Sequence, residues 1–395
     1  MKPLSKKTNG LSQSGIRAIT RLVNEVNGIN LGQGICDMPT PGAIKHAARE
    51  AINSDKSIYT PYEGIRDLQT SIFEKVVSYN RIPCSSPAEV MVSAGSTGAF
   101  VTTVFTLLDP GDEIILFEPF YGYHRNIVDL TGAVARTVSL TDKDWSVDFD
   151  RLEDAINART KAILINTPSN PCGKVWTEGE LLTLLDVMVR HDLYAITDEI
   201  YEYMVYDGRD HVSLASLPGA YDRTVTISGF SKTYNMTGWR LGYAVAAPEI
   251  IGRMGLLNDL FYICAPSPLQ YGVLAAFDMP DEYFDNLLSE YDRKRTLICE
   301  ALSDTGFDAS PPEGSYYVFA RFDALAQQFA GFESDRAACE TLIRNTGVAT
   351  IPGGSFFTDP SRGARYLRFC YAKEYAELEQ ACRQLRERIP LMPRR

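Results

Sequence analysis

Between residues 88 and 245, short apolar runs of strand length alternate with amphipathic stretches of helical length. This alternation is typical of β-α-β units, which build a largely parallel sheet with helices on its faces. Turn-forming sequences such as DPGD at 109–112 separate the segments. Strands are predicted at 90–93, 113–117, 134–138, 161–165, 194–198, 223–228 and 241–246. Helices are predicted at 97–108, 120–131, 148–158 and 177–191.

The C-terminal part has a different pattern, which predicts a second, smaller domain of α+β type. A long polar helix is predicted from about 280 to 304, followed by apolar segments and further helices in mixed order. The first 40 residues lack a sheet of their own. We therefore predict an N-terminal segment at 1–45 that packs with the small domain, a large domain at 46–284 and a small domain at 285–395.

Composition and charge exclude several classes of protein. The 395 residues are 45% apolar and 23% charged, as in ordinary globular proteins, and no apolar run is long enough to span a membrane. The net charge of −11 argues against a nucleic-acid partner. The first 24 residues carry five basic and no acidic side chains. A transit peptide has that pattern, but a short solvated tail is the simpler interpretation, and a cytoplasmic location is predicted.

The cysteines and histidines show no metal-binding pattern. The eight cysteines include no CxxC pair, and the four histidines are scattered along the chain. We therefore predict free thiols in a reducing compartment, and no metal centre.

Polar side chains follow several of the predicted strands, at the carboxyl ends where open α/β sheets bind their ligands. Ser96 and Thr97 follow the strand at 90–93 and begin a helix, so they suit either an anion site or a plain helix cap. Asn170 follows the strand at 161–165 in a proline-rich turn, where it either directs its amide at a ligand or only shapes the turn.

Three charged residues have positions that require a partner. Asp198 ends a buried strand, where an unpaired carboxylate is costly, unless it is a surface or capping residue. Lys232 lies in SGFSKTYNMTGWRLGY with Arg240 nearby, which favours a depressed pKa and a nucleophilic amine over a solvated surface charge. Arg368, inside the apolar YLRFCYA, needs a planar anion such as a carboxylate, or an internal salt bridge.

These features fit one ligand pair, which is pyridoxal phosphate with an amino acid. An anion cradle suits the phosphate, a lysine can form an imine, an aspartate suits the ring nitrogen, and an arginine suits a carboxylate. SKTYNMTGWRLGY, NTPSNPCG and ITDEIY resemble the class I/II aminotransferases, which are fold-type I pyridoxal-phosphate enzymes. The sequence is most similar to the group of kynurenine, glutamine-phenylpyruvate and bacterial aspartate or aromatic aminotransferases, from SGIR at 14–17 to YLRFCYA at 366–372.

The resemblance implies an α/β fold in which a mostly parallel seven-stranded sheet lies between helices, next to a smaller α+β domain. It also implies pyridoxal 5′-phosphate as the cofactor, an amino acid and a 2-oxo acid as substrates, and a homodimer with shared active sites. By this resemblance the catalytic residues are Lys232, which forms the Schiff base, Asp198, which pairs with the ring nitrogen, and Tyr201.

The remaining site residues also follow from the resemblance. Asn170 and Tyr201 bond the ring oxygen, and Tyr121 stacks on the ring. Arg240 binds the phosphate, with Ser96, Thr97 and Ser231 beside it. Tyr59 reaches the phosphate of the neighbouring subunit. The substrate is held by Arg368 at its α-carboxylate, with Gly34, Tyr121 and Asn170 around it.

Three positions depart from the family pattern. Cys36 stands where the family often has proline, and Cys172 replaces the common threonine of NPTG. Gly229 lacks a hydroxyl that some members direct at the phosphate, for which Ser228 or Ser231 can compensate.

The function implied is transfer of an amino group from an L-amino acid to a 2-oxo acid by a ping-pong mechanism. We expect a neutral or aromatic donor, because no second arginine lies in a recognisable substrate-side motif. Aspartate specificity remains the alternative, as do a C–S β-lyase, an oxidase or a decarboxylase on the same scaffold. A non-enzymatic regulator and a nucleotide-binding enzyme fit the sequence less well.

Overall fold

The computed structural model describes residues 2, 4–5, 16–142 and 144–395. Ser14 and Gly15 of the SGIR motif lie outside the described residues. A seven-stranded sheet forms the centre, in the order β2-β8-β7-β6-β5-β3-β4. Its strands are β2 Val90–Ala94, β3 Glu113–Glu118, β4 Val134–Ser139, β5 Thr160–Asn166, β6 Tyr194–Asp198, β7 Thr224–Gly229 and β8 Leu241–Val245. All pairs are parallel except the two made by β8, so the predicted mostly parallel sheet is confirmed.

Helices cover both faces of this sheet because its strands are apolar on both sides. In β3, Ile114 and Leu116 pack with α4, α5 and α8, while Ile115 and Phe117 pack with α7 on the opposite face. The helices around the large sheet are α2 Gly42–Asn53, α3 Arg66–Ser78, α4 Gly95–Leu107, α5 Gly122–Thr131, α6 Phe149–Ala155, α7 Glu178–Arg190, α8 Pro248–Tyr262 and α9 Ser267–Val273.

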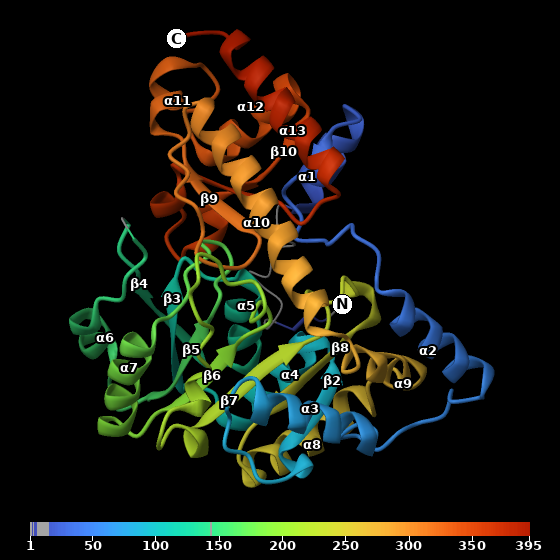
Figure 1. Ribbon diagram of the computed structural model, residues 1–395. Coiled ribbons are helices and arrows are strands. Elements are labelled where there is room, and N and C mark those ends of the chain that lie inside the picture. The colour runs from blue at the N-terminus through green and yellow to red at the C-terminus, as the bar shows by residue number, and fades with distance from the viewer. Residues whose placement is uncertain (1, 3, 6–15, 143) are drawn as a thin grey trace.

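A second, smaller group of elements lies beyond the carboxyl ends of the parallel strands (Figure 1). Its antiparallel sheet has the order β11-β12-β9, and a short parallel pair joins β1 to β10. Its strands are β1 Ile29–Asn30, β9 Tyr317–Arg321, β10 Val348–Ala349, β11 Ile351–Pro352 and β12 Tyr366–Cys370. Its helices are α1 Ile16–Glu25, α10 Asp281–Asp304, α11 Asp323–Gln328, α12 Asp335–Thr346 and α13 Tyr375–Arg388.

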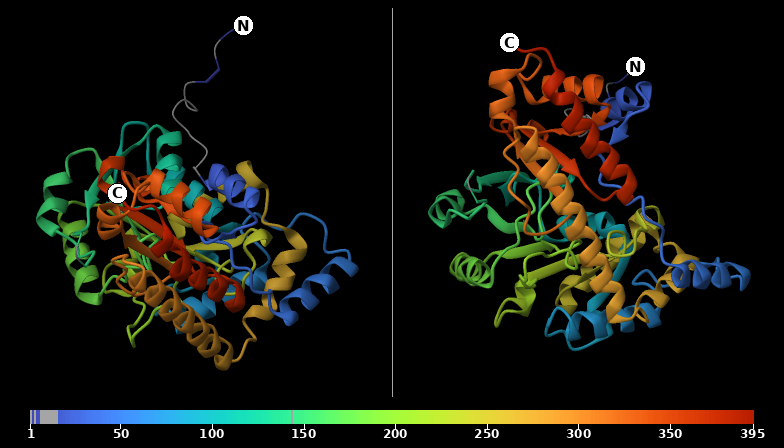
Figure 2. Two further views of the ribbon diagram at one scale, coloured as in Figure 1. Left: turned by 90° about the horizontal axis from the view of Figure 1, so that it is seen from above. Right: turned by 45° about the horizontal axis from the view of Figure 1, so that its top comes forward.

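The chain crosses between the two groups at two places. The N-terminal α1 and β1 lie with α12, α13 and β10, far from α2, which packs on α9 (Figures 1 and 2). Helix α10 runs from the large group into the small one, so the predicted boundary at 285 falls inside this helix. The division into domains therefore stays a prediction.

The eight cysteines are free thiols, as predicted. Across the described part of the chain, no helix is both long and apolar enough to cross a membrane.

Candidate active site

The site lies where the carboxyl ends of the central strands meet the small sheet. Asn170 follows β5, Asp198 ends β6, and Lys232 lies in the turn after β7. Arg368, on β12, comes from the small sheet and bonds directly to Asn170. The structure therefore brings together side chains that the sequence placed at separate strand ends.

Lys232 is partly buried, and its amine donates to the carbonyl oxygen of Gly34 at 3.3 Å. Burial lowers the pKa of this amine, because removing a charge from water disfavours the charged form. Asp198 acts in the opposite direction, and Arg240 is the weakest of the causes that lower the pKa. A depressed pKa was expected from the neighbouring arginine, but the structure gives burial as the main cause.

Asp198 is buried and pairs with a histidine. Its Oδ2 lies 3.0 Å from Nε2 of His124, and the backbone N–H of Ile200 donates to its Oδ1 at 3.3 Å. No lysine or arginine in the described part of the chain forms an ion pair with this carboxylate. Asp198 therefore keeps its capacity to face a cationic ligand.

His124 is a site residue that was not predicted from the sequence, because the four histidines of the chain are scattered and form no recognisable motif. It lies in the first turn of α5, where its backbone N–H bonds to Tyr121 O, and its buried ring meets Tyr121 edge-on at 5.3 Å. The available signal was its position four residues after Phe120 in EPFYGYH, at the start of a helix that follows a central strand. His124 thus holds one oxygen of the Asp198 carboxylate.

Arg368 is buried, and no acidic side chain among the described residues forms an ion pair with it. Its Nη1 donates to Asn170 Oδ1 at 2.8 Å and its Nη2 to Gly32 O at 2.6 Å. The guanidinium lies between the rings of Tyr317 and Phe356, at 4.3 and 5.0 Å from their centroids. Its Nε is buried with no hydrogen-bond partner among the described residues. A buried cation with a free donor favours an anionic ligand over the internal salt bridge that the sequence left open.

A second anion site is formed by Arg240 and the start of α4. Gly95, the first residue of α4, has φ of +74°, and a Cβ there would lie 2.5 Å from Arg240 Nη2. Gly242 is equally constrained, because a Cβ on it would lie 2.4 Å from the backbone nitrogen of Ser96. Both glycines thus let Arg240 and the helix start approach each other, with Ser96 half-buried and Thr97 exposed. A cation beside helix N–H groups suits a phosphate.

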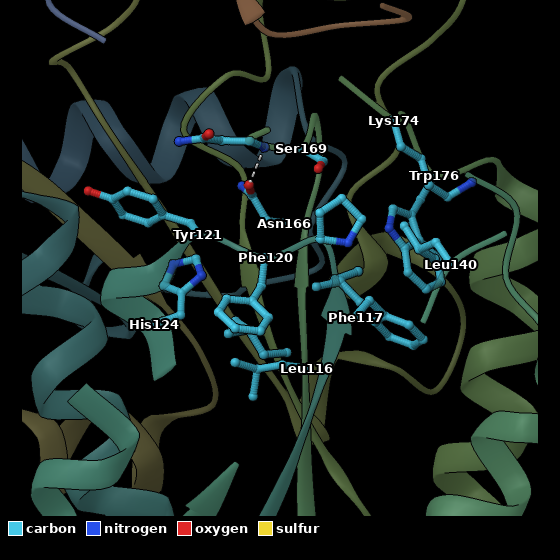
Figure 3. A pocket seen from close by; sticks show the side chains of 14 residues that line it. Leu116, Phe117, Phe120, Tyr121, His124, Leu140, Asn166, Ser169, Lys174 and Trp176 are labelled. Atoms are coloured by element: carbon cyan, nitrogen blue, oxygen red, sulfur yellow. Dashed lines mark hydrogen bonds between the residues drawn. The ribbon is translucent and has the colours of Figure 1, made fainter. Parts of the chain in front are cut away.

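Aromatic side chains line the space between these charged groups. Tyr121 stacks on Tyr123 at 5.1 Å, and the Tyr201 hydroxyl lies 3.4 Å from that of Tyr317. Figure 3 shows a neighbouring pocket with Tyr121 and His124 on one side and Lys174 and Trp176 on the other; it shares Asn170 with the site, but the charged groups described above do not line it. Asn166 on its floor accepts a hydrogen bond from the backbone N–H of Asn170 at 2.8 Å, which fixes the turn that carries Asn170.

Two predicted residues make fewer contacts with this group. Ser231 is buried beside Lys232, but no hydrogen bond is found for its side chain within the described residues. Tyr59 is 77% exposed in the connection between α2 and α3. In the described chain, no hydrogen bond joins Tyr59 to the other predicted site residues.

A network of buried ion pairs and hydrogen bonds connects the segments next to the carboxyl ends of β6 and β7. Glu202 accepts from Lys75 at 2.5 Å and from Ser228 of β7 at 2.7 Å. Glu199, next to Asp198, accepts from Thr197 and pairs with His211 at 2.9 Å. Because these bonds join α3, β6 and β7, they fix the segments that lead to Asp198 and Lys232.

The residues fit pyridoxal phosphate group by group. Arg240 and the start of α4 suit its phosphate, Lys232 suits its aldehyde carbon, and Asp198 suits its ring nitrogen. The unpartnered Nε of the buried Arg368 leaves a donor for the carboxylate of an amino acid. The site therefore combines an amine, a carboxylate and a cation that can bind a carboxylate, and these are the groups that a reaction on an amino acid requires.

Comparison with known proteins agrees with this chemistry. Residues 26–385 match the family model described as aminotransferase class I and II, and the chain belongs to that family. Membership implies pyridoxal phosphate as the cofactor. Aromatic-amino-acid aminotransferase 2 of Thermococcus litoralis is 31% identical over 96% of each chain. Aspartate aminotransferase of Bacillus subtilis is 33% identical over 97% of this chain and 98% of its own.

A solved structure shows the same fold. YbdL of Escherichia coli, for which a methionine aminotransferase function is described, superposes with a TM-score of 0.92 at 27% identity. The alignment covers 98% of this chain and all of that one. The protein is therefore an aminotransferase, while its relatives differ in the amino acid that their names record.

Proposed function

We propose that this aminotransferase binds pyridoxal phosphate through Lys232 and transfers the amino group of a neutral or aromatic L-amino acid to a 2-oxo acid. One observation carries the proposal. The Lys232 amine bonds to Gly34 O, and the Arg368 guanidinium bonds to Gly32 O, two residues away on the same segment. A partly buried amine and a buried cation are therefore held by one short segment, which suits an amino acid held by its carboxylate with its Cα near the amine.

The roles proposed for the other residues, His124 apart, are those that the family resemblance implies. The bound cofactor supplies an electron sink that stabilises negative charge at the substrate Cα. Asp198 keeps a ring nitrogen protonated, because a charge pair a few Å apart is worth about 4 kcal/mol at an effective dielectric near 20. His124 orients Asp198, and Lys232 moves the proton from Cα as base and then as acid. Asn170 and Tyr201 would bond the ring oxygen of the cofactor, and Tyr121 would cover its ring.

The donor preference is argued from charges near the site. A dicarboxylate needs a second cation, since burying its distal carboxylate unpaired costs several kcal/mol. Arg362 is already paired with the buried Glu118 at 3.3 Å, and Arg125 lies 3.8 Å from Asp129. Apolar and aromatic side chains surround the Arg368 end of the site instead, which favours a flat apolar substrate. They include Tyr317 and Phe356, whose rings face the guanidinium, and Tyr121, on which Tyr123 stacks.

The preference is tested by kcat/KM for phenylalanine, methionine and glutamine against aspartate, with one fixed 2-oxo acid. We expect phenylalanine or methionine to exceed aspartate by roughly tenfold or more, as one unpaired carboxylate costs well over 1.4 kcal/mol. Release of pyruvate and ammonia is also assayed in the absence of a 2-oxo acid acceptor. Such release would favour the alternative function, a C–S β-lyase. Aspartate ahead by tenfold would overturn the donor assignment and require a cation from outside the groups described above.

We further propose a homodimer with shared sites. The α2–α3 connection exposes Ile58 and Tyr59, and the end of α8 exposes Leu260, Phe261 and Ile263. Hydrogen bonds from Ser267 to Lys56 O and from Gln270 to Thr60 tie the connection to α9. An exposed apolar patch of this kind favours burial against a second copy.

Subunit mixing tests the shared site. A Tyr59→Ala subunit and a Lys232→Ala subunit are each expected to be nearly inactive alone. If Tyr59 serves the neighbouring site, each hybrid dimer holds one intact site, and random mixing restores about a quarter of the wild-type activity. Activity that stays at the level of the separate variants, or a fully active monomer in sedimentation, would contradict the shared site.

A further inference from the structure

The carbonyl oxygen of Gly34 accepts two hydrogen bonds. One comes from the Lys232 amine at 3.3 Å, and the other comes from the hydroxyl of Tyr316 at 3.1 Å. The Gly34 carbonyl is the one acceptor that the structure gives the Lys232 amine among the described residues. The direction in which this amine points therefore depends on where that carbonyl is held.

Tyr316 is itself fixed by its surroundings. Its side chain is fully buried, and its ring packs against the rings of Tyr201 at 5.1 Å, Tyr317 at 4.7 Å and Tyr291 at 5.9 Å. The Lys232 amine lies 5.6 Å from the centre of the same ring. A ring packed on three sides has little rotamer freedom, so its hydroxyl is a rigid donor.

The Gly34 peptide is confined from a second direction. A Cβ on Gly34 would lie 1.9 Å from the hydroxyl of Tyr317, so this hydroxyl already presses against the glycine Cα. The peptide is thus held by Tyr316 at its oxygen and by Tyr317 at its Cα. Only the first of these is a hydrogen bond to the atom that the Lys232 amine uses.

We infer that Tyr316 is a positioning residue for Lys232, acting through the carbonyl of Gly34. This inference rests on the proposed function, in which Lys232 moves the proton of the substrate Cα. When the substrate displaces Lys232, the free amine keeps its lone pair toward Cα only if one N–H is held elsewhere. The Gly34 carbonyl, fixed by Tyr316, provides that acceptor. Misplacement of a proton-transfer group by about 1 Å costs up to 10²-fold in rate.

The test compares Tyr316→Phe with Tyr371→Phe. Tyr371 is an equally buried tyrosine whose hydroxyl bonds to Tyr206 and to Ser315 O, at 3.2 and 3.0 Å, and no hydrogen bond joins it to Lys232 or Gly34 in the described part of the chain. Each variant loses one buried hydroxyl and keeps its ring. We expect kcat to fall roughly 10- to 100-fold in Tyr316→Phe, with KM changed less than about twofold. The isotope effect with Cα-deuterated phenylalanine should rise, because proton transfer becomes slower.

A second readout does not depend on turnover. The rate at which cofactor-free enzyme attaches added pyridoxal phosphate to Lys232 is measured against pH, with borohydride trapping and peptide mapping. Without the Tyr316 hydroxyl, the Gly34 carbonyl is no longer held toward the Lys232 amine, so the ammonium loses its acceptor and its charged form is less stable. The pH midpoint of attachment should therefore move to lower pH by about half a unit or more in Tyr316→Phe and stay unchanged in Tyr371→Phe.

The outcomes separate the two proposals. A wild-type enzyme that attaches no cofactor at Lys232 would overturn the proposed function, and this inference with it. A wild type that attaches it normally, together with a Tyr316→Phe variant that matches Tyr371→Phe in kcat, isotope effect and pH midpoint, would overturn the role of Tyr316 alone.

Discussion

Replacing Lys232 with alanine is expected to abolish covalent attachment of pyridoxal phosphate and to lower turnover by roughly 10⁴-fold or more. The amine is partly buried, and burial lowers its pKa, so it is available as a nucleophile closer to neutral pH than a surface lysine is. The same amine is proposed as the proton carrier at Cα, a role worth about 10²–10⁴-fold by itself. Loss of both roles explains the size of the effect.

The measurement combines spectroscopy with mass mapping. Wild-type enzyme should be yellow and, after borohydride reduction, should carry the cofactor on the peptide that contains Lys232. Lys161→Ala is the control, because that lysine is 40% exposed and pairs with Asp112 at the amino-terminal end of β5. Lys161→Ala should keep its colour and its activity. A Lys232→Ala enzyme with wild-type turnover would end the proposal that this lysine carries the cofactor.

Replacing Arg368 with leucine should lower kcat/KM by roughly 10²–10³-fold for every amino acid and 2-oxo acid. The buried guanidinium has no acidic partner in the described chain, so the substrate carboxylate is its expected counter-charge. Removing one partner of a buried charge pair costs about 3–5 kcal/mol. An Arg368→Lys variant should recover only part of the activity, because an ammonium cannot replace the planar donors.

A substrate that lacks a carboxylate distinguishes a role of Arg368 in binding the substrate from a role in folding. Wild-type enzyme should prefer phenylalanine over phenethylamine by a large factor, and Arg368→Leu should lose most of that preference. Loss of activity toward both compounds in equal proportion would show that Arg368 serves the structure and not the carboxylate. Arg362→Leu is the control, because Arg362 pairs with Glu118. This variant should keep the wild-type preference for phenylalanine over phenethylamine.

Much of the fold could be predicted because its information is local. The seven strands of the large sheet differ from their predicted ends by one residue at most, since most of them are apolar runs bounded by turn residues. Helix α7 was equally predictable, as Thr177 and Glu180 form a capping box at its start. Lys232, Asp198 and Asn170 could be singled out because each directly follows a central strand.

The sequence by itself determined the class of fold, the family, and the strand ends that carry Lys232, Asp198 and Asn170, because periodicity, turns and motifs are properties of neighbouring residues. The tertiary structure decided which distant segments meet. Only tertiary packing places His124 against Asp198, and it alone brings Gly32 and Asn170 to Arg368. It also places the Tyr316 hydroxyl on the Gly34 carbonyl, to which the Lys232 amine donates. These contacts span 74 to 336 residues, and long-range packing leaves no local pattern in the chain.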